Sequence, residues 1–253
     1  MIVITGPGRS GTTVVAQLYK ELGFDPGGKL VPTERAGLEA REIVEINNAI
    51  IGSLELDTLI RGCRPSMLPT WVKKISEKTI PVTAASKIKR FFASSRNRTG
   101  KLNLINWDKF DQVVENYKKN LQLLSSKFDV CKDPRFSWTL PVWAAADAKI
   151  DNVVVCIRSL SSMVKSRLEA GHLETRSLSE AKNSVIYAAG TLFMAIYSFD
   201  LPYVTLKFPS FLRDPKELYK VLPFPEKVEY KQFERIFFKV VDLDKVHEAD
   251  RKV

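Results

Sequence analysis

A glycine-rich segment near the N-terminus has the residue types and the spacing of an anion-binding loop. It reads Gly6-Pro7-Gly8-Arg9-Ser10-Gly11-Thr12-Thr13, so two glycines five positions apart are followed by hydroxyl residues. An apolar run over residues 1–5 predicts a strand before it, and apolar residues at helical spacing predict a helix after it that ends at Gly23. Such a loop directs backbone N–H groups at a phosphate, and the helix N-terminus adds partial positive charge.

The same loop departs from the pattern of nucleotide hydrolases. That pattern places a Lys and then a Ser or Thr after the second glycine, where they reach the β/γ-phosphates and Mg²⁺. Here Thr12 occupies the Lys position, and the nearest cation is Arg9 inside the loop. The clearest strand ends at Arg158 instead of a metal-binding Asp, and Asp133 follows a shorter strand. The sequence therefore argues against a Mg²⁺-dependent ATPase or kinase and predicts no metal site.

A second anion site is indicated by Arg158 and Ser166. These residues stand eight positions apart, at the end of a predicted strand and in the helix that follows it. A guanidinium and a hydroxyl can hold a phosphate by charge-assisted hydrogen bonds. An Arg that ends a strand is also commonly part of a structural ion pair, so both interpretations stay open at this point.

Strands and helices alternate along the chain. Strands are expected over residues 1–5, 128–131, 152–157 and 203–207. Helices are expected over residues 37–51, from 108, from about 136 to 148, beyond 158, and over 179–199, 215–222 and 229–241. This order is typical of a parallel sheet covered by helices on both faces. We therefore expect an α/β, three-layer P-loop-type fold.

The domain organisation is expected to be simple. No composition shift or linker marks a boundary, so residues 1–253 are predicted to form a single domain. Within it, residues 54–106 are expected to form a basic insertion, broken by prolines, with short helical pieces around 70–78 and 84–94.

The positive charge of the chain is concentrated in one stretch. The 253 residues carry a net charge of +10 at pH 7, and residues 61–101 contain 11 basic residues and one acidic residue, which accounts for the whole excess. The stretch is either a solvated surface or a contact for an anionic partner: a nucleic acid, an anionic membrane surface or an acidic small molecule.

Other features bound the class of protein. Three cysteines cannot form a disulfide framework, which favours a reducing compartment, and the N-terminus begins directly with an expected strand in place of a signal peptide. No apolar stretch approaches the roughly 18 residues of a membrane span. We expect a soluble, cytoplasmic protein.

Four motifs in order resemble the sulfotransferases that use 3′-phosphoadenosine 5′-phosphosulfate (PAPS), in their bacterial-type branch. The first two are Arg9-Ser10-Gly11-Thr12-Thr13 and Ile157-Arg158 with Ser166. The others are Lys132-Asp133-Pro134-Arg135-Phe136 with Leu140-Pro141-Val142-Trp143, and Leu206-Lys207-Phe208 with Asp214-Pro215-Lys216-Glu217-Leu218. Together they cover roughly residues 1–222.

The resemblance implies a function for both anion sites. It implies in-line transfer of a sulfuryl group from PAPS to a hydroxyl or amine, without a metal, with Arg9 stabilising the leaving phosphate. It implies that Arg158 and Ser166 hold the 3′-phosphate. The 5′-phosphate is then held by the residues of the loop: Gly8, Arg9, Ser10, Gly11, Thr12 and Thr13.

Cytosolic animal members of this family use a His between the two anion-binding motifs as general base, but His172 and His247 both follow Arg158. By this resemblance the base is therefore a carboxylate, or the reaction uses none. The candidate carboxylates are Glu34, Glu39 and Glu42, and Glu39 is favoured because Gly37-Leu38-Glu39 best matches the bacterial branch. The alternative for each is a solvated acid on a helix face. Lys132 and Arg135 either face the acceptor or anchor their turn.

The acceptor and the remaining alternatives stay open. The resemblance implies a small-molecule or glycan acceptor. If residues 61–101 fold over the cleft, we expect either that this acceptor is anionic or that the stretch helps to hold the polyanionic cofactor. The Trp that often follows the Thr-Thr pair is Val14 here, which leaves the adenine contact undefined. One competing function is a nucleic-acid- or polyanion-binding protein that uses residues 61–101, although the sequence contains no recognisable nucleic-acid-binding module. The other is a P-loop kinase.

Overall fold

The structure, a computed structural model, describes residues 1–31, 37–54, 107–169 and 178–242. Its centre is a sheet of four strands, all parallel, in the order β2-β1-β3-β4. The strands are β1 (Ile2–Thr5), β2 (Val130–Lys132), β3 (Asn152–Ile157) and β4 (Tyr203–Lys207). In register, Ile4 lies beside Lys132 on one side and Val154 on the other. The expected α/β class with a parallel sheet is confirmed.

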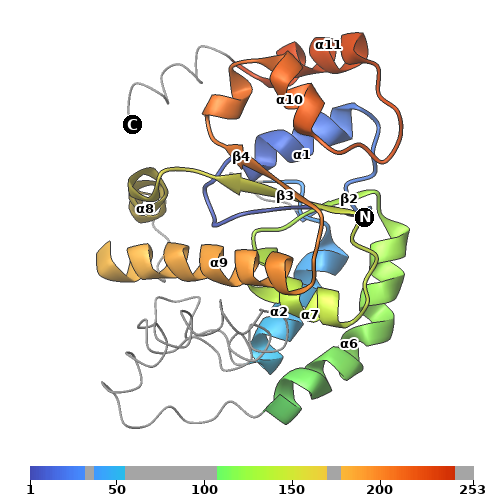
Figure 1. Cartoon of the computed structure of the whole chain (residues 1–253), viewed down its shortest axis with the longest axis vertical. Helices are drawn as coiled ribbons and strands as arrows, with labels where there is room; N and C mark the ends of the chain where they lie inside the picture. The colour runs from blue at the N-terminus through green and yellow to red at the C-terminus, as the bar shows by residue number, and fades with distance from the viewer. Residues whose placement is uncertain (32–36, 55–106, 170–177, 243–253) are drawn as a thin grey trace.

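Helices cover both faces of this sheet and make three layers (Figure 1). One face carries α1 (Thr12–Glu21), α10 (Pro215–Val221) and α11 (Tyr230–Val240), which lie above the sheet in the figure. The other carries α2 (Arg41–Ser53), α6 (Trp107–Lys127), α7 (Phe136–Ala145) and α9 (Leu178–Ser198). Helix α8 (Leu160–Glu169) follows β3 at the left of the view, and a short 3₁₀ helix, η2 (Ser210–Leu212), follows β4.

Two hydrophobic cores, one on each side of the sheet, hold the layers together. Successive strand residues point to opposite faces, so Val3 and Val153 pack with the α2, α6, α7 and α9 layer, while Ile4 and Val154 pack with the α1, α10 and α11 layer. Because β1 and the centre of β3 are buried on both faces, their sequences are continuous apolar runs and not alternating ones.

Several predicted boundaries are wrong by a few residues. The helix expected from residue 37 begins at Arg41, because Leu38 has a φ of 72° and Ala40 pairs with Leu30 in an antiparallel bridge. The strand expected over 128–131 is Val130–Lys132, since these are the residues in register with β1. The helix expected to reach about 148 ends at Ala145.

The other expected strands and helices are present, with ends that differ by at most two residues from the predictions. The helical pieces expected at 70–78 and 84–94, and nearly all of the basic insertion, lie outside the described residues. None of the helices in the described part of the chain combines the length and the apolar character that crossing a membrane requires.

The parallel arrangement determines where the candidate residues meet. All four strands end at the same edge of the sheet, so the segments that follow them gather there. These segments are residues 6–13 after β1, 133–135 after β2, 158–159 after β3 and 208–209 after β4. In open α/β sheets, ligands bind at this carboxyl edge.

Candidate phosphate-binding site

Residues 6–13, here called the phosphate loop, turn tightly between β1 and α1. A Cβ atom on Gly6 would lie 2.0 Å from the backbone oxygen of Cys156 on β3, so only glycine fits there. Arg9 and Gly11 both have left-handed backbone conformations, with φ of 73° and 92°. Turns that contain such residues expose successive backbone N–H groups and form concavities that bind anions. A left-handed backbone is strained at a non-glycine residue such as Arg9, and residues with strained backbones are concentrated at functional sites.

Ser10 gives the loop a second feature of an anion-binding site. Its side chain is 1% exposed, and its Oγ atom has no hydrogen-bond partner among the described residues. Buried hydroxyl groups are almost always hydrogen-bonded, and leaving one unpaired costs roughly 1–3 kcal/mol. A phosphate held by the loop would supply this partner, so the loop fits an anion.

Of the remaining loop residues predicted to bind the cofactor, all but Gly8 lie at the start of α1. Gly11 is the residue before the helix, Thr12 is its first residue and is buried, and Gly8 and Thr13 are half-buried. No acidic residue occupies the first turn of α1, so nothing in that turn opposes the binding of an anion at the helix N-terminus.

The structure brings the two predicted anion sites into direct contact. The Nε atom of Arg9 donates a hydrogen bond of 3.0 Å to the Oγ atom of Ser166. Arg9 belongs to the phosphate loop and Ser166 to α8, and 157 positions separate them in the chain. Helix α8, which carries Ser166, is capped at its N-terminus by Ser159, because the Oγ atom of Ser159 accepts a hydrogen bond from the backbone N–H of Ser162. Arg9 and Ser166 therefore lie side by side at the carboxyl edge of the sheet.

Arg158 reaches the phosphate loop through an aromatic ring for which the sequence predicted no role. Its guanidinium carbon lies 5.2 Å from the ring centroid of Phe208, the residue after β4. The same ring lies against the loop, because a Cβ on Gly11 would be 2.4 Å from its Cδ2 atom. The motif Leu206-Lys207-Phe208 pointed to this segment, but the contact itself is tertiary.

Glu39 and Lys132 form a buried ion pair near the end of β2. The Nζ atom of Lys132 donates a hydrogen bond of 2.5 Å to Oε1 of Glu39 and one of 3.4 Å to the backbone oxygen of Gly37. Lys132 is 2% and Glu39 8% exposed. Glu39 precedes α2 and is buried, so the alternative of a solvated acid on a helix face is wrong for this residue.

The other candidate bases are placed differently. Glu42 lies in the first turn of α2 and forms an exposed ion pair of 2.7 Å with Lys127 on α6. Glu34, His172 and His247 lie outside the described residues. Of the three candidate carboxylates, Glu39 is the one that the described residues hold in a buried pair with a residue of a predicted motif.

Asp133 and Arg135 anchor the turn after β2. The Oδ1 atom of Asp133, a fully buried residue, accepts bonds from the backbone N–H of Arg135 at 2.9 Å and from its Nη1 at 3.1 Å. Its Oδ2 accepts a bond of 2.8 Å from Asn47 on α2. Of the two roles left open for Arg135, this geometry favours the structural one. Within the described ranges, no group of three or more His, Cys, Asp or Glu could hold a metal ion.

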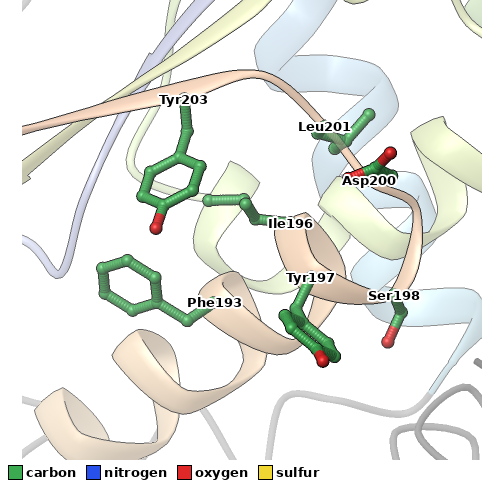
Figure 2. Close-up of a pocket in the computed structure, with 7 residues that line it drawn as sticks. All are labelled: Phe193, Ile196, Tyr197, Ser198, Asp200, Leu201 and Tyr203. Carbon is green, nitrogen blue, oxygen red and sulfur yellow. The ribbon is translucent and has the colours of Figure 1, made fainter. Parts of the chain in front are cut away.

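A surface pocket lies at the opposite end of the sheet. It has a volume of about 660 Å³, and α9 and the start of β4 line it (Figure 2). The rings of Phe193 and Tyr203 meet edge-to-face in it, with centroids 6.2 Å apart and ring planes 80° apart. Tyr203 begins β4 and Lys207 ends it, so the pocket lies about 13 Å along the strand from the carboxyl edge. It is therefore separate from the phosphate loop.

At the carboxyl edge, the described residues thus assemble two guanidinium groups, two serine hydroxyls and a helix N-terminus. This combination has the chemistry to bind phosphate groups, and the buried Glu39–Lys132 pair lies at the end of β2, at the same edge of the sheet. Comparisons of the chain with models of protein families, with curated proteins and with solved structures find no match.

Proposed function

We propose that this protein is a sulfotransferase that moves a sulfuryl group from PAPS to a hydroxyl or amine acceptor. One observation carries the proposal: the hydrogen bond between Nε of Arg9 and Oγ of Ser166. The two motifs each resemble a phosphate-binding part of one enzyme family. They are far apart in the sequence and in contact in the fold. A ligand that carries two phosphate groups, at its 5′ and 3′ positions, suits such an arrangement.

The residues at the edge of the sheet support this choice of ligand. The phosphate loop has an unpaired buried hydroxyl on Ser10 and a helix N-terminus behind it, which favour an anion at the 5′ end. Arg158 and Ser166 supply a cation and a hydroxyl for a second anion. When bound, PAPS supplies an activated sulfuryl group on its 5′-phosphate.

The protein's contribution to transfer is positioning and charge. The S–O bond to the 5′-phosphate breaks as a new S–O or S–N bond to the acceptor forms, and the acceptor loses a proton. Arg9 stabilises the negative charge that develops on the leaving phosphate, an effect that is strong in a site preorganised for it. Glu39 is the proton acceptor in this proposal, and Lys132 orients its carboxylate.

Titration calorimetry with 3′-phosphoadenosine 5′-phosphate (PAP) tests the proposal without knowledge of the acceptor. Wild-type protein is expected to bind PAP more tightly than Mg²⁺-ATP. Arg9→Ala and Ser166→Ala each remove one charge-assisted hydrogen-bonding group, so each is expected to weaken PAP about 10- to 150-fold. Lys20→Ala, near the far end of α1, serves as the control and should bind as wild type does.

Two results would contradict the proposal. Folded wild-type protein that does not bind PAP is not a PAPS-dependent sulfotransferase. A protein that binds Mg²⁺-ATP more tightly than PAP is better described as a P-loop kinase. Residues 61–101 lie outside the described residues, so the alternative of a polyanion-binding protein gains no structural support.

A further inference from the structure

We infer that Phe208 is a positioning residue whose ring holds the phosphate loop and Arg158 in one fixed arrangement, so that the 5′- and 3′-phosphates of a nucleotide bind as a unit. The inference rests on the proposed function, because it concerns the same nucleotide. Phe208 follows β4 directly, and its ring contacts both of the groups concerned.

The first contact is with the phosphate loop. The ring lies so close to Gly11 that a Cβ atom there would be 2.4 Å from Cδ2 and 2.9 Å from Cγ of Phe208. Gly11 is also the residue that precedes α1 and has a left-handed φ of 92°. The ring thus packs on the backbone at the point where the loop becomes the helix, and it limits how far this backbone can move.

The second contact is with Arg158. The guanidinium carbon lies 5.2 Å from the ring centroid, which is within the range of a cation–π interaction. A guanidinium has a fixed planar fork of donors, so its orientation decides whether it can bind a phosphate with two hydrogen bonds. An aromatic face beneath it restricts the side chain to fewer orientations and lowers the entropy lost on binding.

Phe208 is itself fixed from two directions. Its backbone N–H donates a hydrogen bond of 2.7 Å to the backbone oxygen of Ile157, the residue before Arg158. Its ring meets the ring of Phe211 edge-on, with centroids 6.1 Å apart. The backbone of Phe208 is therefore tied to β3 and its ring packs against η2.

A difference in ligand selectivity follows from this geometry. In Phe208→Leu, Arg158 loses the aromatic face, so the 3′-phosphate should lose more binding than the rest of the nucleotide. The ratio of the affinity for PAP to the affinity for adenosine 5′-phosphate measures this contribution. We expect the ratio to fall about tenfold in Phe208→Leu and to return toward the wild-type value in Phe208→Tyr, which retains a ring.

The matched control is Phe224→Leu. Phe224 packs in the same hydrophobic core, against Tyr19 and Phe233. Its substitution by Leu removes an aromatic ring from that core at a position away from Gly11 and Arg158. It should leave the ratio unchanged. The double variant of Phe208→Leu with Arg158→Ala should lower the ratio no further than Arg158→Ala alone, because both act on the same phosphate. Additive losses, or a wild-type ratio in Phe208→Leu, would overturn the inference.

A measurement without nucleotide separates the inference from the proposed function. In protein with ¹³C,¹⁵N-labelled arginine, the Arg158 side-chain protons should show upfield ring-current shifts that disappear in Phe208→Leu and persist in Phe224→Leu. Absence of these shifts in wild type overturns the positioning role even if PAP binds. Wild-type shifts in a protein that does not bind PAP overturn the proposed function and, with it, the nucleotide role of Phe208, while the ring–guanidinium contact stands.

Discussion

The Nζ atom of Lys132 lies 2.5 Å from Oε1 of Glu39, and both side chains are withdrawn from solvent. The two residues are 93 positions apart in the chain and meet where β2 ends and the segment before α2 passes it. Removing two charges from water is costly, and their attraction offsets this cost only while both are present. The pair therefore fixes the segment that carries Glu39 relative to the sheet.

Substitution of Lys132 by Met should destabilise the protein strongly. It leaves the carboxylate of Glu39 buried without its cation, and breaking a buried pair in this way typically costs about 3–5 kcal/mol. Urea unfolding measures the loss. Lys127→Met is the matched control, because Lys127 pairs with Glu42 at the surface and such pairs contribute at most about 1 kcal/mol. Equal losses in the two variants would contradict the buried pairing.

Asn47 should contribute strongly to the free energy of unfolding, although it carries no charge. It lies on α2, is fully buried, and donates to Asp133 while its Oδ1 accepts from Thr139 at 2.8 Å and from the indole of Trp143 at 2.9 Å. Asn47→Leu removes the hydrogen-bond partner of Asp133 Oδ2 and of the Trp143 indole N–H, whereas Thr139 keeps its bond to the backbone oxygen of Arg135. At roughly 1–3 kcal/mol for each of the two buried groups, a loss of about 2–6 kcal/mol is expected.

The neighbouring residue supplies the control for this prediction. Asn48 is exposed on the same helix, so Asn48→Leu removes the same side chain without orphaning a buried group. Urea unfolding of both variants, followed by tryptophan fluorescence, compares them. A loss in Asn47→Leu no larger than in Asn48→Leu would mean that this hydrogen-bond network does not stabilise the fold.

The parts of the fold that the sequence predicted are those set by local pattern. The strands β1, β3 and β4 are short runs bounded by turn residues, and the glycine spacing of residues 6–13 predicted the loop between a strand and a helix. The start of α2 was predicted wrongly. Val31 donates to the backbone oxygen of Glu39, and this pairing keeps the residues before Arg41 extended.

The site was predictable in its residues but not in its connections. Arg9, Arg158 and Ser166 were predicted from motifs. The contact between Arg9 and Ser166 depends on parallel strand order, which the alternation of strands and helices in the sequence indicates. The contacts of Phe208 and the pairing of Glu39 join segments far apart in the chain. Neither leaves a periodic signal in the sequence, because each depends on how two loops meet in space.

Gly11 offers a test of how tightly the phosphate loop is packed. Gly11→Ala forces a side chain into a left-handed conformation and places its Cβ 2.4 Å from the Cδ2 atom of Phe208, which is a steric clash. Gly23→Ala has a similar φ of 97° but meets no described atom within 4 Å, so it has the strain alone, about 1–2 kcal/mol.

Overpacking adds about 1–3 kcal/mol to the cost at Gly11, and PAP binding should be lost there and retained in Gly23→Ala. Urea unfolding and calorimetry on the two variants measure both effects. Equal stability of the two variants would show that the ring of Phe208 moves aside without cost.

The buried thiol of Cys156 predicts how stability depends on alkaline pH. Burial raises the pKa of Cys156 from its ordinary value to about 12, so the folded protein keeps this proton where the unfolded chain loses it. Above about pH 9 the unfolded chain therefore binds fewer protons than the folded one, and the free energy of unfolding falls as pH rises. Below that pH the thiol is protonated in both states and has no effect.

Cys156→Ala removes this contribution. Between about pH 9.5 and 10.5 the free energy of unfolding of the wild type should fall more steeply than that of the variant, by up to about 1.4 kcal/mol per pH unit. Urea unfolding under reducing conditions at pH 7.5, 9.5 and 10.5 gives the two slopes. Cys131 is also buried with a raised thiol pKa, but it is present in both proteins and cancels in the difference. Parallel slopes would show that the Cys156 thiol ionises as readily in the folded protein as in the unfolded chain, and would contradict its burial beside the phosphate loop.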